Sequence, residues 1–174
     1  VISRRSGMPG SARARSQSRQ RHFPLHTLLG SFGGQVAAFA MAYEQLLYDV
    51  SGGVATVTLN RPEQRNALSN QMLTELVDAM ERVRDDDEVR AVVLRGAGEK
   101  VFCAGADLGG FAADVPLVEK HFSSDLFLRF FRLMPRLGKP SLCAANGHVL
   151  AGGMGLALSC DLVIAREGIT FGTP

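Results

Sequence analysis

The sequence predicts an α/β fold in which short strands of a mainly parallel sheet alternate with helices. From residue 43 onward, strand-like runs alternate with longer runs of helical spacing. Residues 91–95 are almost wholly apolar, which is typical of a strand buried on both faces of a parallel sheet. Residues 141–159 read as a strand, a glycine-rich turn and a helix. Together these observations favour parallel strands joined by right-handed crossovers.

Length and composition indicate one globular domain. A chain of 174 residues with 46% hydrophobic and 21% charged residues can bury one core. No apolar run approaches the roughly 18 residues that a membrane span needs. The net charge of +2 combines an arginine-rich start with an acidic remainder. An acidic globular part argues against a nucleic-acid groove, so we expect no nucleic-acid partner.

Residues 1–40 are expected to be a disordered, Arg- and Ser-rich extension, and residues 41–174 the globular core. The extension could be a basic interaction arm or an organelle-targeting segment. It could also have no function, with the protein starting at Met41, and we favour this interpretation because the globular pattern begins there. The absence of a hydrophobic signal core favours a cytoplasmic protein, and the Arg-rich start leaves a mitochondrial location as the alternative.

The first half of the core begins with a predicted hairpin, residues 45–50 and 54–59, joined by Ser51-Gly52-Gly53. Ser69 is a predicted N-cap for a helix over 70–84. Its apolar residues recur at helical spacing and are predicted core: Met72, Leu73, Leu76, Val77, Met80 and Val83. The acidic run 85–88 that follows is expected to be a solvated loop, since a calcium site would need glycines and spaced ligands.

The second half continues with more strands and helices. Strands are predicted over 91–95, 101–104, 141–145 and 162–165, with a further short strand at 168–171; helices are predicted over 117–133 and 154–159. The three cysteines, Cys103, Cys143 and Cys160, show no CxxC spacing and lie among apolar or small residues. We expect buried free thiols and neither a disulfide nor a metal site.

Two small-residue turns each follow a predicted strand, at 103–107 and 150–153. If the two strands are neighbours, free backbone N–H groups from both turns could converge on one oxygen atom. Two such donors form an oxyanion hole, which stabilises a carbonyl oxygen that becomes an enolate. The alternative is that the glycines only let a helix pack closely on the sheet.

The sequence resembles the enoyl-CoA hydratase/isomerase (crotonase) superfamily in four co-linear motifs. They are RPEQRNALS at 61–69, VFCAGADL at 101–108, NGHVLAGGMGLALSCDLVIA at 146–165 and FGTP at 171–174. The resemblance covers about residues 43–174. It implies a crotonase-like spiral of ββα repeats, in proteins that assemble as trimers or hexamers. It also implies that acyl-CoA thioesters are the substrates, with no cofactor apart from the coenzyme A of the substrate.

Carried over motif by motif, the resemblance implies that the Ala106 and Gly152 amides hold the thioester oxygen. The segment 65–68 resembles the loop that cradles the CoA adenine, although an exposed Arg65 is often only solvated. Asp107 is expected to be a structural carboxylate more than an acid or base. The candidate substrate- and CoA-binding residues are Arg65, Asn66, Ala67, Leu68, Ala104, Asp107, Leu108, Gly109 and Gly153.

The chain departs from the family pattern at both glutamates that place and deprotonate a water in the hydratases. The first position is Gly155, and the second follows Pro174, where the sequence ends. We therefore expect an N-terminal fragment of a hydratase- or isomerase-type enzyme, with weak or no activity of its own. The alternative is a thioester-binding or assembly protein without turnover. His148 could substitute as a base, but a loop histidine is more often a structural hydrogen-bonding residue. Nothing in the sequence distinguishes one acyl chain from another.

Overall fold

The computed structural model describes residues 43–107 and 117–173, with side chains from Ser124 onward in the second segment. The predicted extension, residues 1–40, and the predicted site residues Leu108 and Gly109 lie outside the described residues. The chain divides into two units, and the described residues all fall in the second, residues 41–174.

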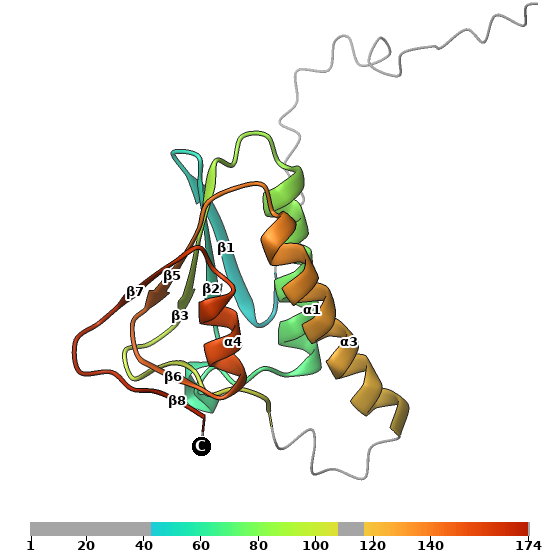
Figure 1. Ribbon diagram of the computed structural model, residues 1–174, viewed down its shortest axis with the longest axis vertical. Coiled ribbons are helices and arrows are strands. Elements are labelled where there is room, and N and C mark those ends of the chain that lie inside the picture. The colour runs from blue at the N-terminus through green and yellow to red at the C-terminus, as the bar shows by residue number, and fades with distance from the viewer. Residues whose placement is uncertain (1–42, 108–116, 174) are drawn as a thin grey trace, which may run out of the picture. The chain divides into compact units, whose positions relative to one another are not determined.

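A five-stranded sheet forms the larger layer of the fold (Figure 1). Its strands in spatial order are β1 (Leu46–Ser51), β2 (Val54–Leu59), β3 (Ala91–Gly96), β5 (Ser141–Ala145) and β7 (Leu162–Ala165). β1 and β2 pair as the predicted antiparallel hairpin, and every other pairing in the sheet is parallel. The predicted α/β class with a mainly parallel sheet is therefore confirmed.

A second, parallel sheet contains β4 (Val101–Cys103), β6 (His148–Leu150) and β8 (Phe171–Gly172). These strands directly follow β3, β5 and β7 along the chain, so the chain crosses from the large to the small sheet three times. The sequence analysis placed residues 146–153 in a turn and missed β6. The final strand begins at Phe171 and not at residue 168 as predicted.

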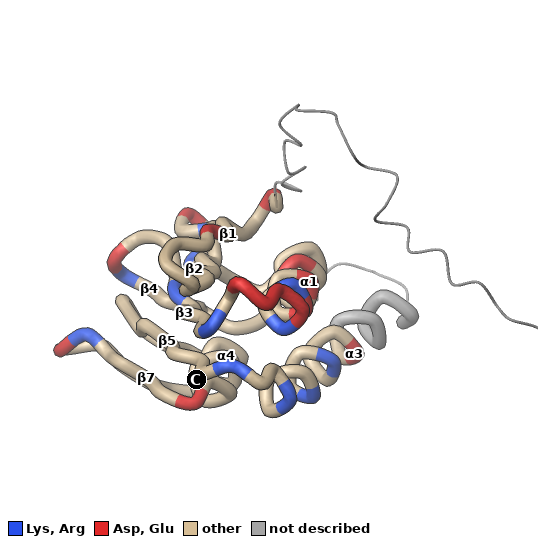
Figure 2. The backbone as a smooth tube through the Cα atoms, turned by 90° about the horizontal axis from the view of Figure 1, so that it is seen from above, with Lys and Arg blue, Asp and Glu red and all other residues tan. Residues whose placement is uncertain are grey.

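Three α-helices lie on one side of the large sheet, as Figures 1 and 2 both show. They are α1 (Asn70–Asp85), α3 (Leu117–Leu133) and α4 (Gly152–Leu158). Two short 3-10 turns, Pro62–Gln64 and Met134–Arg136, complete the helical segments. The predicted N-cap is confirmed, since the Ser69 hydroxyl accepts a hydrogen bond from the Met72 amide at 3.1 Å. The last helix starts at Gly152, two residues before the predicted start.

The core lies between the helices and one face of the large sheet. All six predicted core residues of α1 are buried. The prediction that 91–95 is buried on both faces is wrong, because the helices cover only one face of the sheet. Val92 and Leu94 are buried, whereas Arg95 on the opposite face is exposed.

The exposure of the acidic run and the burial of the cysteines match the sequence analysis. The acidic run 85–88 is exposed and forms a continuous acidic stretch after α1 (Figure 2). The three cysteines are free and buried, as predicted. One feature was not predicted: Leu162 and Ile164 on the sheet's outer strand, β7, are 65% and 63% exposed. In the described part of the chain, no helix is long and apolar enough to cross a membrane.

Candidate active site

The two small-residue turns lie against each other. β4 and β6 are neighbouring parallel strands, so the turns that follow them meet at the same edge of the small sheet. A Cβ built on Gly152 would lie 3.6 Å from Gly105 Cα and 3.7 Å from the Ala106 nitrogen. A Cβ on Gly105 would lie 2.9 Å from the Gly152 nitrogen. The structure therefore brings the predicted residues Ala106 and Gly152 together.

Neither amide donates a hydrogen bond to another backbone group of the described chain. Ala106 lies opposite Leu68 in an isolated parallel bridge, but the Ala106 amide takes part in neither hydrogen bond of that bridge. The Leu68 amide donates to the Gly105 carbonyl at 2.8 Å, and the Asp107 amide donates to the Leu68 carbonyl at 3.1 Å. Gly152 is the first residue of α4, a position with no helical acceptor for its N–H. Both N–H groups can therefore serve a ligand.

Close backbone packing fixes the turn that carries Gly152. Ala151, the residue before it, has φ 46° and ψ −121°, a conformation that favours glycine. Its amide is held by a 2.8 Å hydrogen bond to the Gly172 carbonyl. A Cβ on Gly153 would lie 2.6 Å from the Cys103 carbonyl oxygen, so only glycine lets α4 begin this close to β4. The glycines thus allow close packing, while the Ala106 and Gly152 amides have no backbone acceptor in the described chain.

The predicted adenine-cradling segment 65–68 is built around Asn66, which is fully buried. Its side-chain oxygen accepts from the Arg61 amide, and its nitrogen donates to the carbonyls of Ala97, Val101 and Phe102, at 3.0 to 3.1 Å. Leu68 is also buried, at 2% exposure. These two side chains stabilise the loop from within. Arg65 is exposed and Ala67 half-buried, so these two remain accessible.

Asp107 forms an ion pair with Arg61, with 3.0 Å between the guanidinium nitrogen and the carboxylate oxygen. Arg61 also donates to the Ala67 carbonyl at 2.9 Å. The guanidinium thus ties the turn after β4 to the segment 65–68. The ion pair gives Asp107 a structural contact, and its expected role as a structural carboxylate stays a prediction. The segment is tied again by the Ala104 amide, which donates to the Arg65 carbonyl at 3.0 Å.

Two aromatic rings from α3 stand beside the paired turns, and the sequence analysis missed both. The Cβ position of Gly152 is 3.6 Å from Phe127 Cζ, and that of Gly155 is 2.9 Å from Phe131 Cζ. The rings stack with centroids 6.1 Å apart and planes 23° apart. They form an apolar wall next to the two amides. The signal was present in the sequence, since Phe127 and Phe131 are four residues apart and share a helix face.

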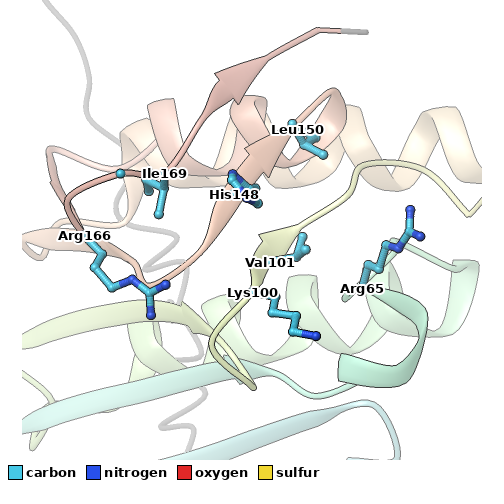
Figure 3. Close-up of a pocket in the computed structure, with 8 residues that line it drawn as sticks. Arg65, Lys100, Val101, His148, Leu150, Arg166 and Ile169 are labelled. Carbon is cyan, nitrogen blue, oxygen red and sulfur yellow. The ribbon is translucent and has the colours of Figure 1, made fainter.

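Two other groups on β4 and β6 are of interest for catalysis, the thiol of Cys103 and the imidazole of His148. Cys103 accepts a hydrogen bond from the Gly105 amide at 3.4 Å, but burial raises the pKa of its thiol to about 12, which excludes a thiolate nucleophile at neutral pH. His148 begins β6, whereas Gly152 follows the other end of that strand. Its Nδ1 accepts from the Thr170 amide at 3.0 Å, and it lines a separate cavity (Figure 3). His148 is therefore a structural hydrogen-bonding residue in this geometry.

The chemistry available to the described residues follows from these contacts. Two backbone donors beside an apolar wall can bind and polarise a carbonyl oxygen. No described group of three or more His, Cys, Asp or Glu residues could hold a metal ion. The arrangement therefore supplies electrostatic stabilisation, and a proton acceptor would have to come from another part of the protein or from the substrate.

Comparisons of the sequence with a family profile and with individual known proteins indicate one and the same family. A family profile described as enoyl-CoA hydratase/isomerase matches residues 49–174. A crotonyl-CoA hydratase of Syntrophomonas wolfei is 37% identical over 134 residues, which are 77% of this chain and 51% of the relative. A short-chain-enoyl-CoA hydratase of Clostridium acetobutylicum is 39% identical over the same shares. The chain thus spans about half the length of these curated relatives.

Solved structures agree with the sequence comparison. An enoyl-CoA hydratase from Bacillus anthracis superposes with a TM-score of 0.70 at 34% identity, over 75% of this chain and 50% of that one. An enoyl-CoA hydratase/isomerase from Xanthobacter autotrophicus gives 0.66 at 39% identity, over 76% and 50%. The repeated crossing between two sheets is accordingly the crotonase fold. On its sequence and on its architecture, the chain belongs to the enoyl-CoA hydratase/isomerase family.

Proposed function

We propose that this protein binds acyl-CoA thioesters and stabilises their enolate with the backbone N–H groups of Ala106 and Gly152. The observation that carries the proposal is the position of these two amides, side by side and without a backbone acceptor in the described chain. A donor in such a hole is typically worth about 2.7–4 kcal/mol of transition-state stabilisation. The first turn of α4 adds its partial positive charge at the same place.

The surroundings support a thioester in preference to a more polar carbonyl compound. Phe127 and Phe131 give one side of the site an apolar wall, which suits an acyl chain and strengthens the electrostatic effect of the donors. Arg65 and the half-buried Ala67 lie on the loop proposed for the CoA moiety. No cofactor other than the coenzyme A of the substrate is needed for this chemistry.

The reaction type is proposed to be enoyl-CoA isomerisation or hydration, with isomerisation favoured. Glycine at position 155 removes one of the two expected proton-transferring groups, and a positioned acid or base supplies about 10²–10⁴ in rate. The same observation favours an alternative, a thioester-binding protein of this fold without turnover. We also propose the family's trimeric or hexameric assembly for the whole protein, and a cytoplasmic location.

The test compares a thioester with its carbonyl-free analogue. Butanoyl-CoA and S-butyl-CoA differ at the carbonyl oxygen, so only the first can use the two amides. We expect butanoyl-CoA to bind more tightly in calorimetry, and its ¹³C-labelled carbonyl to shift to lower wavenumber in the infrared difference spectrum. Slow exchange of its α-protons in D₂O would indicate enolate formation, whereas binding without exchange would favour the non-catalytic alternative.

Gly152→Pro removes one donor at the first helical position, where proline is tolerated. Gly152→Ala keeps the donor and is the matched control for the backbone change, since its Cβ would make only ordinary contacts. The carbonyl shift should shrink in the proline variant more than in the alanine variant. Equal affinity for both ligands in the unsubstituted protein, with no carbonyl shift, would contradict the proposed oxyanion hole.

A further inference from the structure

The peptide group that carries the Ala106 N–H is fixed from its carbonyl side. A peptide group is planar and almost always trans, so its N–H and its C=O point in opposite directions. The Ala106 N–H shares its peptide group with the Gly105 carbonyl, which accepts a hydrogen bond from the Leu68 amide at 2.8 Å. The Ala106 N–H therefore points away from Leu68, and the Ala106 nitrogen lies 3.7 Å from the Cβ position of Gly152. The Leu68 amide thus sets the direction of the proposed oxyanion-hole donor.

The Leu68 amide is fixed in the same way by Arg61. Its N–H shares a peptide group with the Ala67 carbonyl, which accepts from the Arg61 guanidinium at 2.9 Å and from the Ser69 amide at 3.2 Å. The shorter of these bonds has a charged donor, and charge-assisted hydrogen bonds are roughly twice as strong as neutral ones. Two peptide groups in series therefore connect the guanidinium of Arg61 to the N–H of Ala106.

Further contacts hold Arg61 in position. The guanidinium nitrogen that bonds Ala67 also pairs with the Asp107 carboxylate at 3.0 Å. The Arg61 amide donates to the side-chain oxygen of Asn66 at 3.0 Å, and the Arg61 carbonyl accepts from the Asn66 amide at 2.8 Å. Asn66 is fully buried, and the Arg61 side chain is only 13% exposed. Water competes little at such a position, so the charge acts more strongly there than on the open surface.

We infer that Arg61 is a positioning residue for the Ala106 donor and acts on it through these two peptide groups. Hydrogen bonds in a chain polarise one another, so a cation at one end makes the N–H at the other end a stronger donor. The Gly152 donor is supported differently. The carbonyl of its peptide group, on Ala151, accepts from the Met154 amide at 2.9 Å, and no described cationic side chain donates to it. The role of Arg61 rests on the proposed function, in which the Ala106 amide binds the thioester oxygen.

The first test needs no ligand. Arg61→Gln removes the cation, Arg61→Lys keeps a cation of another shape, and Arg95→Gln makes the same charge change at an exposed residue on the uncovered face of the large sheet. In ¹H–¹⁵N spectra of the full chain, the amide protons of Leu68 and Ala106 should move upfield in Arg61→Gln, because a weaker hydrogen bond deshields the proton less. The Gly152 amide should move little, and Arg95→Gln should leave all three amides in place.

Ligand binding distinguishes positioning of the donor from a general loss of structure. Butanoyl-CoA can use the Ala106 amide and S-butyl-CoA cannot. We therefore expect Arg61→Gln to weaken butanoyl-CoA binding at least about threefold and to change S-butyl-CoA binding by less than about twofold. The infrared shift of the butanoyl-CoA carbonyl should shrink in Arg61→Gln, recover in part in Arg61→Lys and be unchanged in Arg95→Gln.

The outcomes separate this inference from the proposed function. Equal losses for both ligands would show that Arg61 only maintains the fold of its loop, and would overturn the inference. A carbonyl shift of the same size in Arg61→Gln and in the unsubstituted protein would also overturn it, while the oxyanion hole stands. If the unsubstituted protein shows no carbonyl shift, the proposed function itself fails. If Arg61→Gln does not fold, Arg61→Lys takes its place in the comparison, and its carbonyl shift should be smaller than that of the unsubstituted protein.

Discussion

The ring of Phe131 lies where a side chain on Gly155 would begin, with Phe131 Cζ 2.9 Å from the Cβ position of Gly155. The ring is also held edge-to-face against Phe130, with centroids 5.6 Å apart. Position 155 is where the family resemblance expects the first glutamate. The packing of α3 on α4 therefore leaves no room for a carboxylate side chain at this position. A glutamate could be introduced there only if an aromatic ring moved.

We expect Gly155→Glu and Phe131→Ala to be strongly coupled. Overpacking by the new side chain should cost about 1–3 kcal/mol of stability. Replacing a helical glycine should recover up to about 1 kcal/mol, because glycine has a low helix propensity. In the Phe131→Ala background the clash is absent, so the glutamate should cost less by about 1–2 kcal/mol. Chemical denaturation of the four proteins of the double-mutant cycle measures this coupling. Leu158→Glu, at a 65% exposed position of the same helix, is the control and should change stability little. Additive effects would show that the ring moves aside freely.

Ala151→Gly should stabilise the protein. Ala151 has φ 46°, and a non-glycine residue in such a conformation costs about 1–3 kcal/mol, whereas glycine loses about 0.5–1 kcal/mol more backbone entropy on folding. We expect a net gain of about 1 kcal/mol in the free energy of unfolding. The contrasting variant is Ala79→Gly inside α1, which should lose at least about 1 kcal/mol. A loss of stability in Ala151→Gly would mean that the alanine methyl group makes contacts worth more than the strain.

Asn66→Asp should be among the most damaging single-atom changes in the chain. The new carboxylate can still accept a hydrogen bond from the Arg61 amide. It cannot donate to the three carbonyl oxygens that accept hydrogen bonds from the Asn66 side chain in the natural protein. Each unsatisfied buried polar group costs about 1–3 kcal/mol, so we expect a loss of at least about 3 kcal/mol. Gln64→Glu, the same amide-to-carboxylate change at an exposed position, is the matched control and should change stability little. Thermal unfolding of both variants checks the prediction, and similar melting temperatures would contradict it.

The three buried cysteines should make stability fall at high pH. Burial raises the pKa of Cys103, Cys143 and Cys160 to about 12, from an ordinary thiol value of 9.0. The unfolded thiols lose their protons first, so their contribution to stability is complete below pH 9 and is lost as the pH rises toward 12. Denaturation curves between pH 8 and pH 11, with a triple Cys→Ala variant as control, should show a steeper decline for the natural sequence.

Thiol reactivity tests the same burial directly. At pH 8 a thiol with a pKa near 12 is ionised to the order of 10⁻⁴, so a disulfide reagent should react with the native chain very slowly. In denaturant, all three thiols should react. Rapid titration of one or more thiols in the native protein would show that the region around them opens readily.

Local patterns in the sequence predicted most of the fold. Turn chemistry predicted the hairpin, capping preference predicted Ser69 as the N-cap, and helical spacing predicted α1 and α3. Each of these signals acts over a few residues. β6 was missed because its three residues lie between an Asn-Gly turn and a run of glycines, and only pairing with β4 and β8 makes them a strand. The burial of β3 was overestimated because apolar content does not say which sheet face a helix covers.

The candidate site was also predictable only in part, because local sequence patterns identify its turns but not the contacts around them. The turns at 103–107 and 150–153 could be recognised from glycine and from the motif resemblance. Their contact depends on the pairing of β4 and β6, so local patterns could offer it only as a condition and only the motif resemblance implied it. The spacing of Phe127 and Phe131 places both rings on one face of α3, but their contact with α4 is long-range and no local pattern encodes it. The same holds for the contacts of Asn66 with residues 97–102.

The paired N–H groups of Ala106 and Gly152 belong to the peptide backbone, and this has an evolutionary consequence. Every amino acid except proline carries the same N–H, so exchange of side chains at these two positions leaves both donors in existence. The walls around them, such as Phe131, are ordinary side chains that one nucleotide change can replace. Substitutions in the surroundings can therefore change what lies beside the two amides while both donors are kept.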